Sequence, residues 1–312
     1  MNKTAPAHIS LFISMAIYAA GFTIIKEVTP QHLGPMGFVA LRLLGATPVL
    51  WLAGLFLREK AERADIPKFA LLSLCGVTIN QTLFVRGMSL TSPINGAIIM
   101  ITSPLLVLVL GSIILKERIT LLRFAGIAVG LAGAVLLILT GTLANAREDS
   151  PLGDLFIFIN ALSWGTFLVL VKPMMKKYST VMILKWVFLF GMIIIVPLGI
   201  PDLQKADWKT FSESTLPDGS FFGTVWFNIA FVVFGVTLIA YQLNTYALKA
   251  LSPSVVSAYI YLQPVMAAGI ALYFGKDSLT WEKVLSAALI FTGVMMASKA
   301  KNVMKNDAAE KP

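Results

Sequence analysis

The chain has 312 residues, of which 57% are hydrophobic and only 13% are charged, and its mean hydropathy is +0.81. Soluble domains carry about a quarter of charged residues, so this composition excludes an ordinary soluble globular protein. The net charge of +9 is spread over short segments between apolar runs, which argues against a nucleic-acid-binding surface.

Apolar runs of about 20 residues recur along the whole chain, each bounded by charged residues, Pro or Gly. This pattern is typical of transmembrane helices, and the runs are much longer than the ~10 alternating residues of a barrel strand. We therefore expect an all-α integral membrane protein with ten transmembrane helices, near 8–28, 36–57, 67–88, 94–115, 121–141, 153–172, 179–200, 222–247, 254–274 and 281–299.

The distribution of basic residues predicts the orientation of these helices. With a cytoplasmic N-terminus, 16 of the 25 Lys and Arg residues lie on the inner side and 7 on the outer side. The other two, Arg42 and Lys185, lie inside apolar runs. The positive-inside rule then predicts a multi-pass protein of the plasma (inner) membrane with both termini in the cytoplasm.

The first, third, fourth, sixth, eighth and ninth runs hold polar or aromatic side chains within otherwise apolar sequence. One example is SAYIYLQPVM, residues 257–266, in the ninth run. Tyr259 and Gln263 are four residues apart there and share one face of an α-helix. We expect such groups to line a substrate cavity, together with Tyr18, Asn80, Gln81, Phe84, Asn95, Ile99, Thr102, Trp164, Tyr241 and Asn244. The alternative for each is a hydrogen bond between neighbouring helices.

Arg42 and Lys185 have two interpretations as well. Their long side chains can reach the nearer lipid headgroups while their stems stay buried. Alternatively, they face the cavity and meet a substrate carboxylate. All sixteen acidic residues lie in loops, termini or helix ends, which favours a uniporter or exchanger, or coupling through Glu27 or Glu117.

Two halves of the chain match each other in sequence. The second half repeats residues of the first at corresponding positions: Ser92–Pro93 and Ser252–Pro253, Pro104 and Pro264, Gly133 and Gly293, Tyr18 and Trp164. Because five helices are an odd number, a second copy enters the membrane upside down. The sequence predicts two inverted five-helix repeats, residues 1–145 and 146–312, with Pro104 and Pro264 as matched hinges beside the cavity.

The fifth and tenth runs carry small residues at four-residue spacing, including Gly126 and Gly130, which allow close helix approach. We expect these two helices to pack against the bundle or in a dimer contact, outside the transport pathway. The protein is then a monomer or a homodimer, with the lipid bilayer and a small-molecule substrate as its partners.

The sequence carries no motif of an enzyme active site. It has no Gly-rich phosphate loop, nucleophile elbow or HExxH, and no Cys/His cluster. The single cysteine, Cys75, lies within the third run and cannot form an intrachain disulfide. We expect no catalytic residues, no metal and no cofactor, and no nucleic-acid partner.

Nearly the whole chain resembles the EamA-type members of the drug/metabolite transporter superfamily. The resemblance is carried by TSPINGAIIMITSP with LKERITLLRFAGIAVGLAGAVLLI, by YALKALSPSVVSAYIYLQP with GKDSLTWEKVLSAALIFTGVMMA, and by LSWGTFLVLVK. It implies ten helices, cytoplasmic termini and secondary transport, most often export of amino acids or related metabolites. Lys276–Asp277 stands where the family commonly has Gly-Glu, and the acidic position is kept.

We therefore expect a secondary transporter that moves small metabolites, amino acids or related zwitterions above all, out of the cell by alternating access. One alternative is an importer of a nucleobase, vitamin or nucleoside-like compound, because the sequence sets no direction. Another, from a different class, is a flippase-like or structural membrane subunit.

Overall fold

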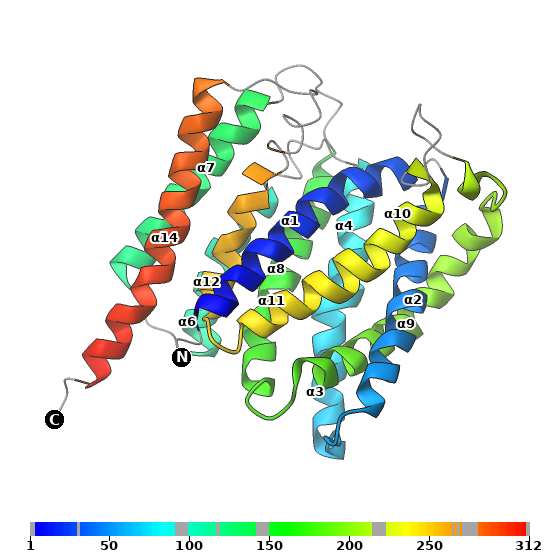
Figure 1. Ribbon diagram of the computed structural model, residues 1–312, viewed down its shortest axis with the longest axis horizontal. Helices are drawn as coiled ribbons and strands as arrows, with labels where there is room; N and C mark the ends of the chain where they lie inside the picture. The colour runs from blue at the N-terminus through cyan, green and yellow to red at the C-terminus, as the bar shows by residue number, and fades with distance from the viewer. Residues whose placement is uncertain are drawn as a thin grey trace.

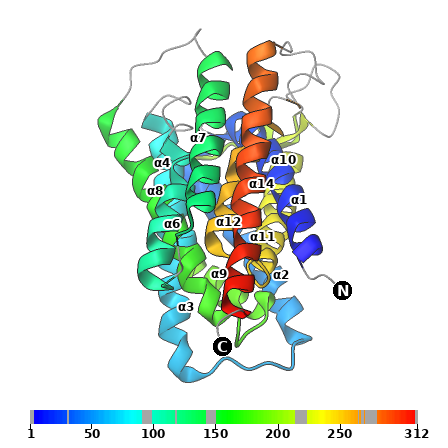
Figure 2. The ribbon, with the colours of Figure 1, turned by 90° about the vertical axis from the view of Figure 1, so that its left-hand side faces the viewer.

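The computed structural model describes residues 4–29, 32–90, 99–116, 119–141, 150–213, 223–263, 265–266, 269 and 280–309. These residues form helices packed as a bundle (Figure 1). The first residues of α1 (Thr4–Val28) and the last residues of α14 (Trp281–Ala309) lie toward the same end of the bundle (Figure 2). The predicted all-α class is confirmed.

Six helical stretches in the described part of the chain are long and apolar enough to cross a membrane. They are Thr4–Gly21 of α1, α2 (Pro35–Leu55), Arg63–Met88, α8 (Pro151–Met174), α9 (Thr180–Lys205) and Val225–Ala247. Two shorter apolar stretches are α6 (Ser103–Ile114) and Leu121–Leu136 of α7 (Leu121–Gly141). The number of ten crossings and the inverted repeat stay predictions.

The third and eighth apolar runs contain π-helical turns that the sequence did not indicate. In the third run, α3 (Ile66–Ser73) is followed by the π-helix η2 (Leu74–Thr78) and α4 (Ile79–Leu90). In the eighth, α10 (Val225–Phe231) is followed by the π-helix η5 (Val232–Ala240) and α11 (Tyr241–Ala247). Such turns change the hydrogen-bond register of a helix and are frequent at functional sites.

The fourth and ninth runs are also irregular. A turn at Ile101–Thr102 precedes α6, and Pro104 lies in the first turn of α6, where a missing N–H costs little. Pro104 therefore starts a helix, where the sequence predicted a kink within a continuous one. In the ninth run, α12 (Pro253–Ala258) passes into the 3₁₀-helix η6 (Tyr259–Tyr261). Pro264 lies outside the described residues.

Helices α7 and α14 pack closely against each other at one side of the bundle (Figures 1 and 2). A Cβ atom added to Gly293 would lie 2.4 Å from the backbone nitrogen of Gly130, and one added to Gly126 would lie 2.6 Å from that of Ala297. Real Cβ atoms do not approach backbone this closely, so the glycines are what permits the contact. The small residues act here as the sequence predicted, by allowing close helix approach.

Helices α2 and α9 are joined at both ends by carboxylates. Asp202, near the end of α9, accepts hydrogen bonds from the backbone N–H groups of Met36 (2.9 Å) and Gly37 (3.1 Å) at the start of α2. Glu59, in the segment after α2, accepts one from the N–H of Ser179, which precedes α9 (2.9 Å). Each carboxylate satisfies exposed N–H groups at a helix N-terminus and complements the helix dipole there.

Candidate functional site

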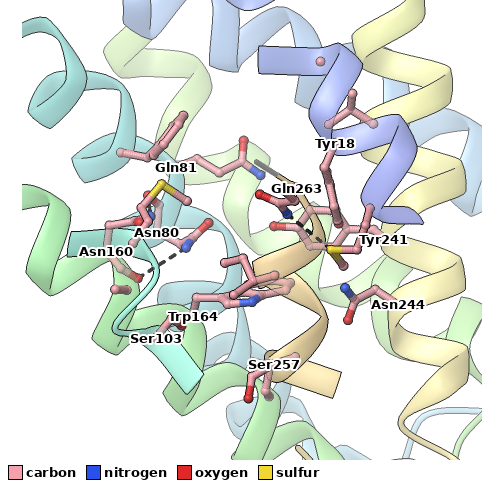
Figure 3. Close-up of a pocket in the computed structure, with 18 of the residues that line it drawn as sticks. Tyr18, Asn80, Gln81, Ser103, Asn160, Trp164, Tyr241, Asn244, Ser257 and Gln263 are labelled. Atoms are coloured by element: carbon pink, nitrogen blue, oxygen red, sulfur yellow. Dashed lines mark hydrogen bonds between the residues drawn. The ribbon is translucent and has the colours of Figure 1, made fainter. Parts of the chain in front are cut away.

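A cavity of about 140 Å³ lies among α1, α2, α4, α8, η5, α11 and α12. Its lining includes nine of the side chains expected from the sequence: Tyr18, Arg42, Asn80, Gln81, Phe84, Trp164, Tyr241, Asn244 and Gln263. Figure 3 shows that these side chains converge from helices far apart in the sequence. Aromatic and neutral polar groups thus line one cavity, as in many substrate sites.

Trp164 and Tyr241 form an aromatic wall of the cavity. The Trp164 ring stacks on Phe167 at a centroid distance of 5.3 Å and meets the edge of Tyr241 at 5.5 Å. Phe188 contacts Tyr241 from another direction, edge to face, at 5.4 Å. These contacts fix both rings, because each aromatic pair adds about 0.5–1.5 kcal/mol beyond its buried area.

The π-helix η2 is stabilised by side chains from other helices. The Tyr241 hydroxyl donates to the carbonyl oxygen of Gly76 (2.9 Å), and the Ser163 hydroxyl donates to that of Cys75 (2.7 Å). Both carbonyls lie within η2, where the α-helical hydrogen-bond pattern is interrupted. Tyr241 is therefore both a cavity wall and a support for the irregular helix beside it.

Asn80 and Asn160 hold α4 against α8. The side-chain amide of Asn160 donates to the Asn80 carbonyl (2.6 Å), and that of Asn80 donates to the Asn160 carbonyl (3.4 Å) (Figure 3). The two residues thus bond each other's backbone across the helix interface. Both residues also line the cavity. The sequence left open whether Asn80 lines the cavity or bonds a neighbouring helix, and in the structure it does both.

Several lining residues carry buried polar atoms without a hydrogen-bond partner. They are the Tyr18 hydroxyl, both side-chain amide atoms of Gln81, the Ser103 hydroxyl and the Asn244 side-chain oxygen. A buried polar group left unsatisfied costs about 1–3 kcal/mol. Other buried atoms of this kind lie elsewhere in the described part of the chain, but five of them belong to residues of one cavity, where a polar ligand can pair with them.

Arg42 is the charged side chain of the described cavity lining. Its side chain is buried, and its Nε donates to the Thr237 hydroxyl on η5 (3.0 Å). It interacts electrostatically with Tyr18 and Tyr241, which line the same cavity. The position corresponds to the cavity-facing interpretation of Arg42 and not to a side chain that reaches toward the headgroups.

The structure places Tyr259 away from the cavity. The sequence argument assumed a continuous α-helix, in which Tyr259 and Gln263 share a face. The 3₁₀-helix η6 has three residues per turn instead of 3.6, so Tyr259 turns away and Ile260 lines the cavity with Gln263. The Tyr259 hydroxyl lies 2.7 Å from Nδ1 of His8 instead.

Three more expected residues lie outside the cavity lining. Nζ of Lys185 lies 4.9 Å from the ring centroid of Trp51, near the end of α2. The Thr102 hydroxyl donates to the carbonyl oxygen of Ile99 within the turn before α6 (2.6 Å). Neither residue lines the cavity. Asn95, like Pro264, lies outside the described residues.

Other lining residues were not singled out from the sequence, among them Met15, Met100, Ser103, Asn160 and Ser257. A signal was present for one of them. Asn160 lies four residues before Trp164 and therefore on the same helix face. For Ser103 the turn at Ile101–Thr102 decides its direction, and sequence periodicity does not reveal that turn.

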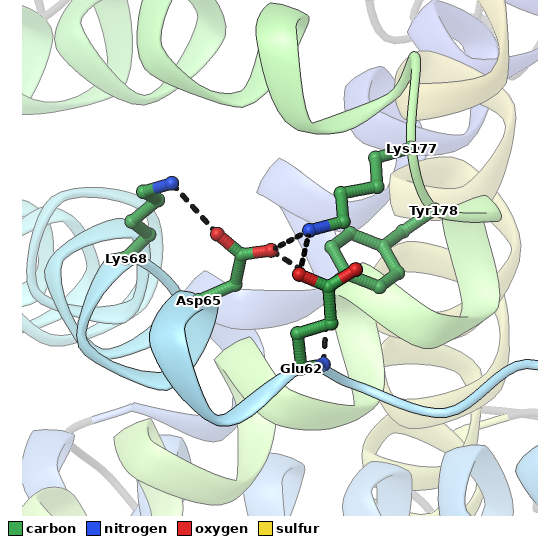
Figure 4. A network of polar contacts seen from close by, with 5 residues as sticks. All are labelled: Glu62, Asp65, Lys68, Lys177 and Tyr178. Atoms are coloured by element: carbon green, nitrogen blue, oxygen red, sulfur yellow. Dashed lines mark hydrogen bonds and ion pairs between the residues drawn. The ribbon is translucent and has the colours of Figure 1, made fainter.

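A second polar cluster lies outside the cavity, between the segment before α3 and the α8–α9 connection (Figure 4). The buried Asp65 carboxylate accepts hydrogen bonds from Lys68 Nζ (2.7 Å), Lys177 Nζ (2.6 Å) and the Tyr178 hydroxyl (2.7 Å). Lys177 also contacts Glu62. The carboxylates of Asp65 and Glu62 raise the pKa of Lys177. The cluster ties the two connections together at one end of the bundle.

Comparison with known proteins identifies the family. The model of the EamA-like transporter family matches residues 5–139 and again residues 151–299. The uncharacterized transporter YyaM of Bacillus subtilis (strain 168) is 26% identical and covers 97% of this chain and 98% of its own length. An uncharacterized transporter of Archaeoglobus fulgidus is 25% identical over 93% of this chain and 96% of its own.

A probable terminal-alkyne amino-acid exporter of Streptantibioticus cattleyicolor is 23% identical, with 95% of each chain covered. A crystal structure 19% identical in sequence superimposes with a TM-score of 0.73 over 96% of this chain and 99% of its own, which shows a shared fold. The two family matches together span most of the sequence. This chain, a multi-pass membrane protein, belongs to the EamA-like transporter family.

Proposed function

We propose that this transporter exports amino acids or related zwitterions by alternating access, as an exporter, exchanger or uniporter. The observation that carries the proposal is the cavity, in which unsatisfied neutral polar groups, aromatic rings and the Arg42 guanidinium surround one small space. Amide and hydroxyl groups can bond both an amine and a carboxylate, and aromatic faces accept a cation. The amino-acid exporter among the relatives supports the same substrate class.

The size of the cavity favours small solutes. Its volume of about 140 Å³ is close to the ~150 Å³ of a cavity that holds one benzene ring. An amino acid of moderate size suits this space better than a nucleoside, which adds a sugar to a base.

The transport cycle follows from two inverted halves, residues 1–145 and 146–312. Three observations support this division. The family model matches once in each half. A π-helical turn precedes cavity residues in both η2–α4 and η5–α11. The chain is irregular both at Ile101–Thr102 and at η6, shortly before matched prolines. Two such halves can rock about the cavity and open it to either side.

The basic residues support an inner-membrane protein with both termini in the cytoplasm, because 16 lie on that side in this orientation and 7 on the other. The cavity lining contains no carboxylate among the described residues, so no titrating acidic group is available there to couple transport to protons. We infer that the substrate gradient alone drives exchange.

Counterflow in proteoliposomes tests the proposal. Purified protein is reconstituted, loaded with unlabelled solute and supplied with radiolabelled amino acids, nucleosides or vitamins in parallel. We expect accumulation of labelled amino acids, unchanged when an uncoupler collapses the proton gradient. Accumulation of nucleosides or vitamins alone contradicts the substrate class. Loss of amino-acid counterflow with the uncoupler contradicts the coupling and directs attention to Glu27 and Glu117.

A further inference from the structure

The charge of the cavity carries information beyond its size and polarity. Among the described residues of the lining, Arg42 is charged and all others are neutral. The structure shows ion pairs at Asp65 and Lys177, and it shows none for Arg42 among the described residues. The cavity therefore holds one positive charge that no described carboxylate balances.

Arg42 has donors to offer a ligand. A guanidinium carries five N–H donors and stays protonated in proteins. The hydrogen bond that the structure shows for it runs from Nε to the Thr237 hydroxyl, at 3.0 Å. A buried cation without an ionic partner costs several kcal/mol of desolvation, and an anion placed against it offsets that cost.

Tyr18 supplies a second donor in the lining of the same cavity. Its hydroxyl is buried without a hydrogen-bond partner, and the side chain interacts electrostatically with Arg42. In Figure 3, Tyr18 projects from α1 toward Gln81 and Gln263. A phenol donor without a partner and a guanidinium that keeps further N–H donors, both lining one cavity, are suited to the two oxygens of a carboxylate.

An ammonium group finds no comparable partner. The lining offers it only neutral acceptors, such as the unsatisfied side-chain oxygen of Asn244, and the aromatic faces of Trp164 and Tyr241. These groups replace its hydration only in part, and Arg42 repels it in a medium of low dielectric constant. The positive charge of a zwitterion therefore reduces its affinity for this space.

We propose that the cavity selects its ligands by net charge and binds small monocarboxylates as monoanions, with the carboxylate held by Arg42 and Tyr18. A monoanion binds more tightly than the zwitterion of the same shape, and the corresponding cation binds least tightly. The inference rests on the proposed function, transport of small solutes through this cavity, and replaces the proposed zwitterions with carboxylates in which the amine is absent, oxidised or acylated.

Three ligands of similar size and shape but different net charge test whether charge determines the affinity. They are 4-methyl-2-oxopentanoate, leucine and leucinamide, which at about pH 7 are mainly a monoanion, a zwitterion and a monocation. Isothermal titration calorimetry on the full-length protein in detergent gives the three dissociation constants. We expect the monoanion to bind at least about tenfold more tightly than leucine, the value for one charge-assisted hydrogen bond.

Two cavity variants locate the effect. Arg42→Gln is expected to weaken binding of the monoanion by about 10- to 100-fold and to leave leucinamide binding unchanged or tighter. Tyr18→Phe is expected to weaken binding of the monoanion by about 2- to 10-fold. Lys185→Gln, whose side chain lies outside the cavity, is the matched control and keeps the wild-type ranking. Arg42→Lys keeps the positive charge and is expected to keep the ranking of the three ligands. It shows whether the site tolerates a substitution if Arg42→Gln does not fold.

The outcomes distinguish the inference from the proposed function. If leucine binds as tightly as the monoanion or more tightly, selection by charge is wrong while amino-acid export stands. If the ranking persists in Arg42→Gln, the carboxylate does not bind at this place and the inference is overturned. If Arg42→Gln cannot be purified, a Tyr18→Phe variant that binds the monoanion as tightly as wild type overturns it instead. If none of the three ligands binds, the inference is overturned together with the substrate class.

Discussion

Arg42 on α2 and Lys185 on α9 illustrate how two basic side chains within apolar helices acquire different surroundings. Both are basic side chains within apolar helices, each near the start of the second helix of its half. Arg42 is buried, bonds Thr237 and lines the cavity. Lys185 is half-buried, and its Nζ lies 4.9 Å from the ring centroid of Trp51.

The neighbours of each cation explain the difference. The stem of Lys185 packs over Gly54, where an added Cβ atom would lie 2.8 Å from its Cδ, and its charge rests on an aromatic face. No cation–π contact is seen for Arg42 among the described residues, and its Nε reaches a hydroxyl of η5 instead. One cation is satisfied within the helix pair α2–α9, and the other retains donors for a ligand. The position of a basic residue within an apolar run therefore does not by itself show whether the residue lines the cavity.

We expect the largest difference in transport between variants that remove Arg42 and variants that remove Lys185. Arg42→Leu is expected to lower counterflow of a carboxylate substrate by about 10- to 150-fold, because a charge-assisted hydrogen bond in a buried site contributes about 1.5–3 kcal/mol. Lys185→Met keeps the length of the side chain and is expected to leave counterflow near the wild-type rate. Equal losses in the two variants contradict the comparison, provided that both proteins elute as single species in size-exclusion chromatography.

The aromatic partner of Lys185 provides the next test. Trp51→Leu removes the cation–π contact and the edge-to-face contact with Trp186, whose ring centroid is 5.4 Å away. Together these contribute about 1–2 kcal/mol, so the midpoint of thermal unfolding falls. Substrate affinity stays the same, because Trp51 lies outside the cavity lining. If Trp51→Leu instead lowers the substrate affinity and leaves the thermal stability unchanged, Trp51 belongs to the substrate pathway.

Thr237 positions Arg42 and gives a smaller effect. Its hydroxyl accepts from Arg42 Nε (3.0 Å) and donates to the Val232 carbonyl within η5 (2.7 Å). Thr237→Val removes both bonds, and we expect the affinity for a carboxylate to fall by about 2- to 10-fold. Thr237→Ser restores the hydroxyl and is expected to recover the affinity. If the valine variant loses only thermal stability, Thr237 supports the π-helix alone.

Lys177, just before α9, is a basic residue that is paired with carboxylates, in contrast to Arg42 in the cavity. The Asp65 and Glu62 carboxylates raise its pKa above the ordinary value of 10.5. A raised pKa gives stability that is fully present below the unfolded-state value and is lost only as the pH rises above it. The stability difference between wild type and Lys177→Met should therefore stay constant from about pH 6 to 9. A difference that disappears as the pH rises over this interval, measured by thermal unfolding in detergent, contradicts the assignment.

Much of the cavity lining follows from the sequence because the membrane restricts the alternatives. Polar side chains such as Gln81 and Asn244 cannot face lipid without cost, so their presence in apolar runs already predicts an interior position. Matching of the two halves then groups them on corresponding helices. Local irregularity is harder to predict, since the η6 turn that moves Tyr259 out of the lining leaves no signal in hydrophobic periodicity.

The sequence by itself determined the helical class, the membrane-spanning runs and the small residues that let α7 and α14 meet, because each depends on local composition in an apolar solvent. Only the tertiary structure decided which polar groups are already paired. Asn80 bonds Asn160 and Tyr241 bonds Gly76, whereas the Tyr18 hydroxyl has no partner and Arg42 has no ionic one among the described residues. The reason is physical: whether a donor is satisfied depends on atoms brought within about 3 Å from distant parts of the chain, and no single helix supplies them.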